Sequence, residues 1–144
     1  MKDERGFTLV EILTVVVIIG IMTFAAIPNI SRWISHSRFK GFVRDVYSEF
    51  QQGRTRAVAT GLAHQVVVDN VSSTVRLRRV SDNVFVRNLV SAPADCIISA
   101  GTSVTFNTNG TASGQGNVRI RNQIITADDN VINVTLGTGR IRIQ

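Results

Sequence analysis

The chain has 144 residues, the length of one domain with short extensions, and it carries a formal net charge of +6. Only Lys2 and Lys40 are lysines, and every other basic residue is an arginine. Arginine suits bidentate contacts to phosphate and carboxylate. The basic surface therefore indicates either an anionic partner, nucleic acid or a membrane surface, or a solvated surface that keeps the chain soluble. The single cysteine, Cys96, excludes an intrachain disulfide and is predicted to be a buried small side chain.

An apolar stretch follows a short charged leader. As a helix, residues 8–27 would span about 30 Å, which matches the hydrocarbon core of a membrane. Cleavage after Ala25 as a secretory signal peptide is one alternative, and it would release a soluble domain that begins near Ala26. The length of the stretch and Glu11 argue against it. A plain N-terminal anchor is the other alternative. More basic residues follow the stretch than precede it, but long C-terminal domains translocate regardless of flanking charge.

Glu11 is the one carboxylate in this stretch, and an ionised carboxylate in a membrane-length apolar segment costs roughly 3 kcal/mol. Thr8 and Glu11 have the spacing of a capping box, in which each side chain accepts a hydrogen bond from the other residue's backbone N–H. A carboxylate in the first turn also suits the helix dipole. The box explains a helix that begins near Thr8, but not why a helix begins inside an apolar segment.

The stretch RGFTLVE at residues 5–11 resembles the processing site of type IV prepilins and type II secretion pseudopilins. The leader ends in Gly6, Phe7 follows, and Glu11 is the fifth residue after the break. The resemblance implies that a prepilin peptidase cuts between Gly6 and Phe7 on the cytoplasmic face and methylates the Phe7 amine. It also implies that Glu11 pairs with the cationic N-terminus of a neighbouring subunit, which makes an intramembrane carboxylate tolerable.

A helical period resumes after Pro28 as an i, i+3, i+4 stripe. The stripe consists of Ile30, Trp33, Ile34, Phe39, Phe42, Val43, Val46, Tyr47, Phe50, Ala57 and Val58. The charged residues placed off or beside it are Arg38, Lys40, Arg44, Asp45, Glu49 and Arg54. Gly61 is the expected C′ residue. These patterns predict one helix over residues 8–60, with Pro28 as a kink or weak point.

The remaining residues are predicted to form strands, because short Val-rich segments with alternating polarity are separated by turn residues. The predicted strands are residues 65–69, 74–80, 84–90, 95–99, 104–106, 117–125, 131–136 and 140–143. One long helix followed by strands predicts an α+β fold, with the helix packed on one face of an antiparallel β-sheet. The expected domains are a prepilin leader (1–6), the transmembrane part of the N-terminal helix (7–28), a periplasmic amphipathic helix (29–61) and an antiparallel β domain (62–144).

Three further segments resemble the GspH/FimT family, which contains the H-type minor pseudopilins of type II secretion and the FimT-type minor pilins of type IV pili. They are GRTRA at residues 53–57, TFNTNGT at 105–111 and LGTGRIR at 136–142. The resemblance implies a pilin-like fold, a single pass through the bacterial inner membrane and a periplasmic C-terminal domain. It implies other pilin or pseudopilin subunits as partners, and a place near the tip of a pilus or pseudopilus.

No catalytic constellation is present in the sequence, so the chain is predicted not to be an enzyme and to need no cofactor. His36 and His64 are far apart along the chain, and no Cys/His spacing suits zinc. The run Asp128, Asp129 and Asn130 offers oxygen ligands for a cation, but three polar residues between two strands usually form a turn. We therefore predict no metal site.

Three arginine pairs share the pattern Arg–apolar–Arg, which places both arginines on one face of a strand, about 6.6 Å apart. They are Arg76 with Arg78, Arg119 with Arg121, and Arg140 with Arg142. One interpretation is half-buried strands whose arginines are solvated. The other is an anion-binding surface, since neighbouring strands would align up to six guanidinium groups to bind double-stranded DNA with strong salt dependence.

The resemblance to FimT-type minor pilins bears on the second interpretation. In those proteins a terminal G-R-x-R motif is associated with DNA binding during uptake, and residues 139–142 match it, although secretion-type relatives can end in a similar run. Two functions stay open. The first is a minor subunit of a type II secretion pseudopilus or type IV pilus, assembled into a periplasmic filament for protein secretion. The second is a FimT-type minor pilin that binds DNA for natural transformation.

Overall fold

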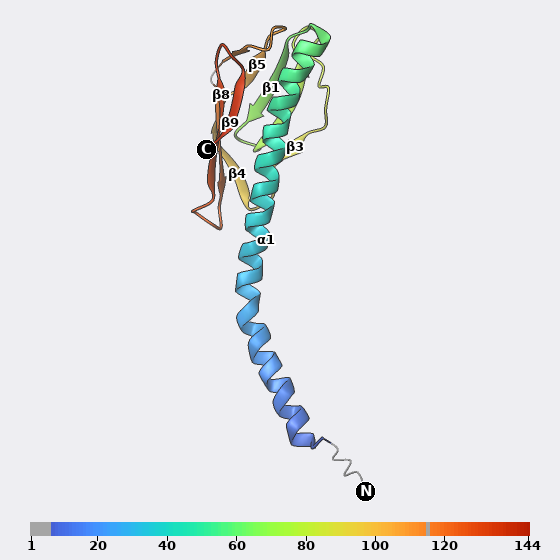
Figure 1. The fold of residues 1–144 in the computed structure, drawn as a ribbon, viewed down its shortest axis with the longest axis vertical. Helices are drawn as coiled ribbons and strands as arrows, with labels where there is room; N and C mark the ends of the chain where they lie inside the picture. Colours follow the sequence, from blue (N-terminus) through green and yellow to red (C-terminus); the bar gives the residue numbers. More distant parts are fainter. Residues whose placement is uncertain (1–6, 115) are drawn as a thin grey trace. The chain divides into compact units, whose positions relative to one another are not determined.

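The structure is a computed structural model of the chain, and it describes residues 7–114 and 116–144, apart from the side chains of residues 25–29. The chain forms two compact units, Met1–Ile34 and Ser35–Gln144. Helix α1 (Leu9–Thr60) contributes to both units and is drawn from blue to green in Figure 1. The helix predicted over residues 8–60 is thus confirmed to within one residue, and it is continuous through Pro28.

The two ends of α1 have the caps that the sequence predicts. Thr8 Oγ1 accepts a hydrogen bond from the Glu11 N–H at 3.2 Å, which is one half of the capping box. Gly61 follows the last helical residue with a φ of +64°, the left-handed conformation that favours glycine at C′. Among the helical residues whose side chains are described, no stretch is both long enough and apolar enough to cross a membrane.

The strands of the C-terminal unit form two antiparallel sheets. The five-stranded sheet has the order β3-β2-β1-β5-β6, and the four-stranded sheet has the order β4-β7-β8-β9. The strands are β1 (His64–Asp69), β2 (Thr74–Arg79), β3 (Val90–Ser91), β4 (Cys96–Gly101), β5 (Val104–Phe106), β6 (Ala112–Ser113), β7 (Asn117–Asn122), β8 (Asp129–Thr135) and β9 (Arg140–Ile143). The α+β fold with an antiparallel β domain is confirmed, but the strands divide between two sheets because β4 pairs with β7 whereas β5 pairs with β1.

Two predicted strands are shorter than the sequence suggests. Residues 84–90 form only an isolated bridge between Phe85 and Arg78, followed by β3, because the segment leaves β2 where Arg87 pairs with Glu49 of α1. The strand predicted over residues 117–125 ends at Asn122. The Asn122 side-chain Oδ1 accepts hydrogen bonds from the backbone N–H groups of Ile124 and Ile125, at 2.9 and 3.1 Å, and these bonds turn the chain.

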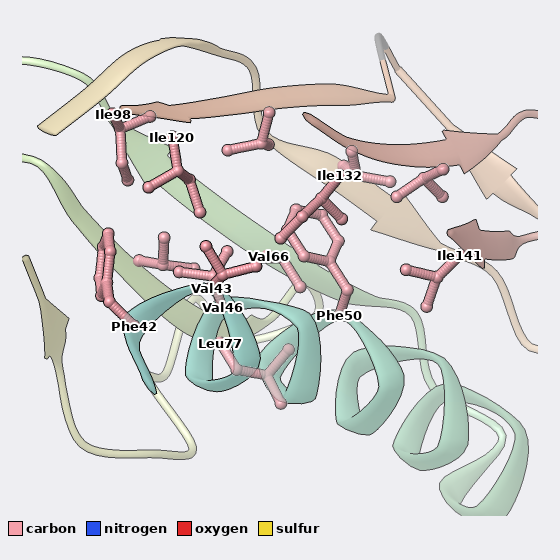
Figure 2. Packing of buried hydrophobic residues seen from close by; sticks show 14 of the residues in the cluster. Phe42, Val43, Val46, Phe50, Val66, Leu77, Ile98, Ile120, Ile132 and Ile141 are labelled. Carbon is pink, nitrogen blue, oxygen red and sulfur yellow. The ribbon is translucent and has the colours of Figure 1, made fainter. Parts of the chain in front are cut away.

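The core lies between α1 and both sheets of the C-terminal unit. Figure 2 shows Val43, Val46 and Phe50 of α1 facing the sheets, with Phe50 directed toward Ile132 of β8. The helical stripe is thus confirmed in its central part, from Phe39 to Ala57. Its first members, Ile30, Trp33 and Ile34, are exposed, as is Val58. Glu49, which the sequence places off or beside the stripe, is only 1% exposed and pairs with Arg87.

Candidate functional site

The first turns of α1 present a carboxylate among exposed apolar side chains. Glu11 lies in a shallow depression that it lines together with Phe7, Ile12, Val15 and Val16. The described side chains from Leu9 to Phe24 are all exposed, so this part of the helix offers its whole circumference to a partner. A carboxylate in such surroundings is stabilised by a cationic group once water is excluded. Gly6, the other half of the predicted cleavage site, lies outside the described residues.

Four arginines share the outer face of the four-stranded sheet. Arg119 and Arg121 on β7 and Arg140 and Arg142 on β9 are exposed, whereas the apolar residue between the members of each pair is buried. β8 lies between these strands, and its Asn133 is opposite Arg142. The predicted placement of each pair on one strand face is therefore confirmed, and one strand separates the two pairs.

Asp129 of β8 gives the two arginine pairs different electrostatic surroundings. Its Oδ1 accepts from Arg119 Nε at 3.1 Å and its Oδ2 accepts from Arg121 Nε at 3.3 Å. One carboxylate thus offsets part of the positive charge of both β7 arginines. Within residues 7–114 and 116–144, Arg140 and Arg142 form no ion pair. The arginines of β9 are consequently the more available pair for an external anion.

Arg76 and Arg78 do not join this face, because β2 belongs to the other sheet. The Arg76 guanidinium lies over the Phe85 ring, 3.9 Å from its centroid. Arg78 donates to the side-chain oxygens of Asn83 and Gln65. Both side chains are therefore engaged in holding the segment after β2. A single face of six guanidinium groups is not formed.

The acidic run Asp128, Asp129 and Asn130 lies at the start of β8 and makes contacts within the fold. The carboxylate of Asp128 contacts His36 Nδ1 of α1 at 2.7 Å, and Asn122 Nδ2 donates to Ser35 Oγ at 2.9 Å. Asp129 and Asn130 belong to β8 itself. These contacts tie the helix to the four-stranded sheet. In the part of the chain that the structure describes, no group of three acidic, His or Cys side chains is placed to hold a metal ion.

Cys96 and His64 are both buried. Cys96 is 3% exposed, as the sequence predicts, and burial raises the pKa of its thiol to about 11, with a smaller contribution from Asp95. The thiolate that reacts with oxidants or metals is therefore disfavoured. His64 is 2% exposed and its Nδ1 contacts the Leu62 carbonyl oxygen at 2.8 Å. Both residues have structural roles.

The three segments that resemble the GspH/FimT family meet at the end of α1, although they are far apart in the sequence. Arg54 Nε donates to the Gly110 carbonyl oxygen at 3.2 Å. Gly139 has a φ of +62°, and a Cβ at that position would lie 2.1 Å from the same oxygen. Gly53 is less crowded, because a Cβ there would lie 3.1 Å from side-chain atoms of Leu77 and Val66. In the sequence, the available signal is the glycine that each of the three segments contains.

Known proteins are similar to this chain in its N-terminal motif and along most of its sequence. Residues 1–27 match the family described as the prokaryotic N-terminal methylation motif. The chain is 31% identical to the type IV major fimbrial protein FimA of Dichelobacter nodosus over 134 residues, which cover 93% of this chain and 72% of that protein.

Solved structures share the fold. The type IV minor pilin FimU of Pseudomonas aeruginosa matches with a TM-score of 0.61 at 17% identity, over 75% of this chain and 89% of that one. The minor pseudopilin EpsH from the type 2 secretion system of Vibrio cholerae matches with a TM-score of 0.57 at 10% identity, over 70% of this chain and 91% of that one. With the N-terminal methylation motif, the identity to FimA and this shared fold together, the chain belongs to the type IV pilin family.

Proposed function

We propose that this chain is a minor subunit of a type II secretion pseudopilus or a type IV pilus, assembled into a filament through α1. The observation that carries the proposal is the exposed apolar start of α1, which bears Glu11 within the methylation motif. A side-chain surface of this kind needs lipid or other subunits to cover it. The fold shared with a minor pilin and a minor pseudopilin supports the minor role.

The same proposal includes processing and location. A prepilin peptidase cuts between Gly6 and Phe7 and methylates the new amine. Residues 7–28 then hold the subunit in the bacterial inner membrane as a single pass, and residues 62–144 lie in the periplasm. On assembly, the Phe7 amine of one subunit pairs with Glu11 of the next. N-terminal mass spectrometry of the native protein tests this step, since a secretory signal peptide would instead give a mature end near Ala26.

Glu11→Ala is expected to separate processing from assembly. The variant should still be cleaved, methylated and held in the membrane fraction. Its amount in sheared or purified filaments should fall about tenfold or more, because an unpaired intramembrane amine in the neighbouring subunit costs a few kcal/mol. Immunoblots of membrane and filament fractions measure both quantities. Glu11→Asp, which keeps the charge on a shorter side chain, is the matched control and should retain part of the incorporation.

Normal incorporation of Glu11→Ala would contradict the role of Glu11. A mature N-terminus that begins elsewhere than at Phe7 would contradict the processing step. A chain that is processed but never found with a filament would contradict the proposed function as a whole.

DNA binding as a FimT-type minor pilin is the second candidate, and the exposed arginine pair of β9 favours it. Arg140 and Arg142 share a sheet face with Arg119 and Arg121 and have no ion pair in the described residues. Guanidinium groups on such a surface bind phosphates by counterion release, without sequence preference. Under this proposal the chain takes up double-stranded DNA for natural transformation.

The double variant Arg140→Ala/Arg142→Ala is expected to weaken DNA binding about tenfold or more and to lower the salt slope by about 2. The matched control, Arg119→Ala/Arg121→Ala, should have a smaller effect because Asp129 already offsets those charges. Gel-shift titrations of the full chain in detergent micelles over a range of salt concentrations measure both. Equal affinity of the Arg140→Ala/Arg142→Ala variant and the unmodified chain would refute this candidate.

A further inference from the structure

The segment between β2 and β3 exposes apolar side chains although the fold holds it tightly. We name residues 80–89 the β2–β3 loop. Val80, Val84, Phe85 and Leu89 are between 43% and 50% exposed. Apolar side chains gathered on one loop and bordered by charged residues are typical of interaction sites in soluble domains.

The backbone of the β2–β3 loop is fixed to the end of β2. The Arg79 N–H donates to the Val84 carbonyl oxygen at 2.8 Å, and the Val86 N–H donates to the Leu77 carbonyl oxygen at 2.9 Å. Phe85 forms a β-bridge with Arg78. These bonds set the position of Val84 and Phe85 before any partner arrives.

Side chains fix the same loop at two further points. The Arg76 guanidinium lies over the Phe85 ring, 3.9 Å from its centroid. Arg87 Nη1 lies 3.0 Å from Glu49 Oε1, and this carboxylate is only 2% exposed. Burying a carboxylate is unfavourable unless it is paired. The loop thus has one strongly specified conformation, and a preorganised surface binds with less loss of conformational entropy.

The charges around the loop define the partner. Arg79 pairs with Asp82 and Arg87 with Glu49, but the guanidinium groups of Arg76 and Arg78 face no carboxylate in the described part of the molecule. Their Nε atoms are buried without a hydrogen-bond partner there. The surface is therefore apolar with a positive border. A second copy of this chain, whose net charge is +6, is a poor electrostatic match.

We propose that the β2–β3 loop docks a different subunit of the filament, one that presents apolar side chains within an acidic surface. This inference rests on the proposed function, because a minor subunit has unlike subunits as neighbours. Phe85, Val84 and Leu89 make the apolar contact, and the positive border selects the partner by charge.

Site-specific photo-crosslinking in cells that assemble the native filament tests the proposal. The full chain carries p-benzoylphenylalanine in place of Val84, or in place of Val71 as the matched control. Val71 is 98% exposed and lies in the turn between β1 and β2. We expect irradiation to give an adduct from position 84, several-fold above that from position 71. Its cross-linked peptide, identified by mass spectrometry, should come from another pilin-like subunit and contain acidic and apolar residues.

The double variant Val84→Ser/Leu89→Ser adds a second measurement. It should keep the thermal unfolding midpoint of the unmodified chain, because both side chains are half exposed, and it should be depleted from filaments, whereas Val71→Ser should not. The proposal is overturned if position 84 gives no adduct although the chain is in the filament, or if the adduct is with a second copy, with lipid alone or equal to that of position 71. If the chain never enters a filament, the proposed function itself fails.

Discussion

Gly139→Ala is expected to destabilise the C-terminal unit by about 2–5 kcal/mol, combining a left-handed backbone penalty of about 1–2 kcal/mol with overpacking of about 1–3 kcal/mol. The new Cβ would lie 2.1 Å from the Gly110 carbonyl oxygen, a backbone atom that also accepts from Arg54 Nε. The Gly139 N–H in turn donates to the Thr135 carbonyl oxygen at 2.9 Å. Relief of the clash therefore disturbs one of these bonds. Chemical denaturation followed by circular dichroism measures the loss.

Gly137→Ala is the matched control, because Gly137 also has a positive φ, +80°, but no atom lies within 4 Å of the Cβ position. We expect only the backbone penalty there, about 1–2 kcal/mol. Equal losses at the two positions would show that the approach to Gly110 does not matter. The comparison also explains the glycine before Arg140. The fold requires it whether or not Arg140 and Arg142 bind DNA, so the G-R-x-R match alone cannot assign that function.

The helix and the sheet faces could be predicted because their signals are local. The stripe from Phe39 to Ala57 repeats with the helical period, and Thr8 and Gly61 have the chemistry of caps. Alternation placed the arginines of each pair on one face, which the exposed Arg119 and Arg121 confirm. Each of these features depends on residues within a few positions of one another.

The features that the sequence did not reveal depend on contacts between distant residues. The order of the strands in each sheet decides that β8 separates β7 from β9 and that Asp129 reaches Arg119 and Arg121. Alternation over residues 84–90 looked like a strand, but the pairing of Arg87 with Glu49 takes the chain away from β2. β6 has only two residues, too few to show any period.

Arg87→Ala is expected to destabilise the fold by about 1–3 kcal/mol at neutral pH, because it leaves the buried Glu49 carboxylate without its cation. Burial raises the pKa of Glu49 above its ordinary value of 4.5, and the Arg87 guanidinium is the chief opposing influence. The folded chain therefore holds this proton more tightly than the unfolded chain does. This contribution to stability falls as the pH rises from 4.5 through the raised pKa.

Removing Arg87 raises the pKa of Glu49 further, so the loss in Arg87→Ala should be largest at neutral pH and should shrink as the pH falls toward 4.5. The double variant Glu49→Gln/Arg87→Ala also removes the charge of the Glu49 carboxylate. It should recover most of the stability that Arg87→Ala loses and should lack this pH dependence. Thermal unfolding of the three chains over a series of pH values measures both effects. A loss that is the same at every pH, or no recovery in the double variant, would mean that Arg87 stabilises the loop by packing. Recovery would instead show that the loss in Arg87→Ala comes from the unpaired Glu49 carboxylate and not from the lost contact area of Arg87.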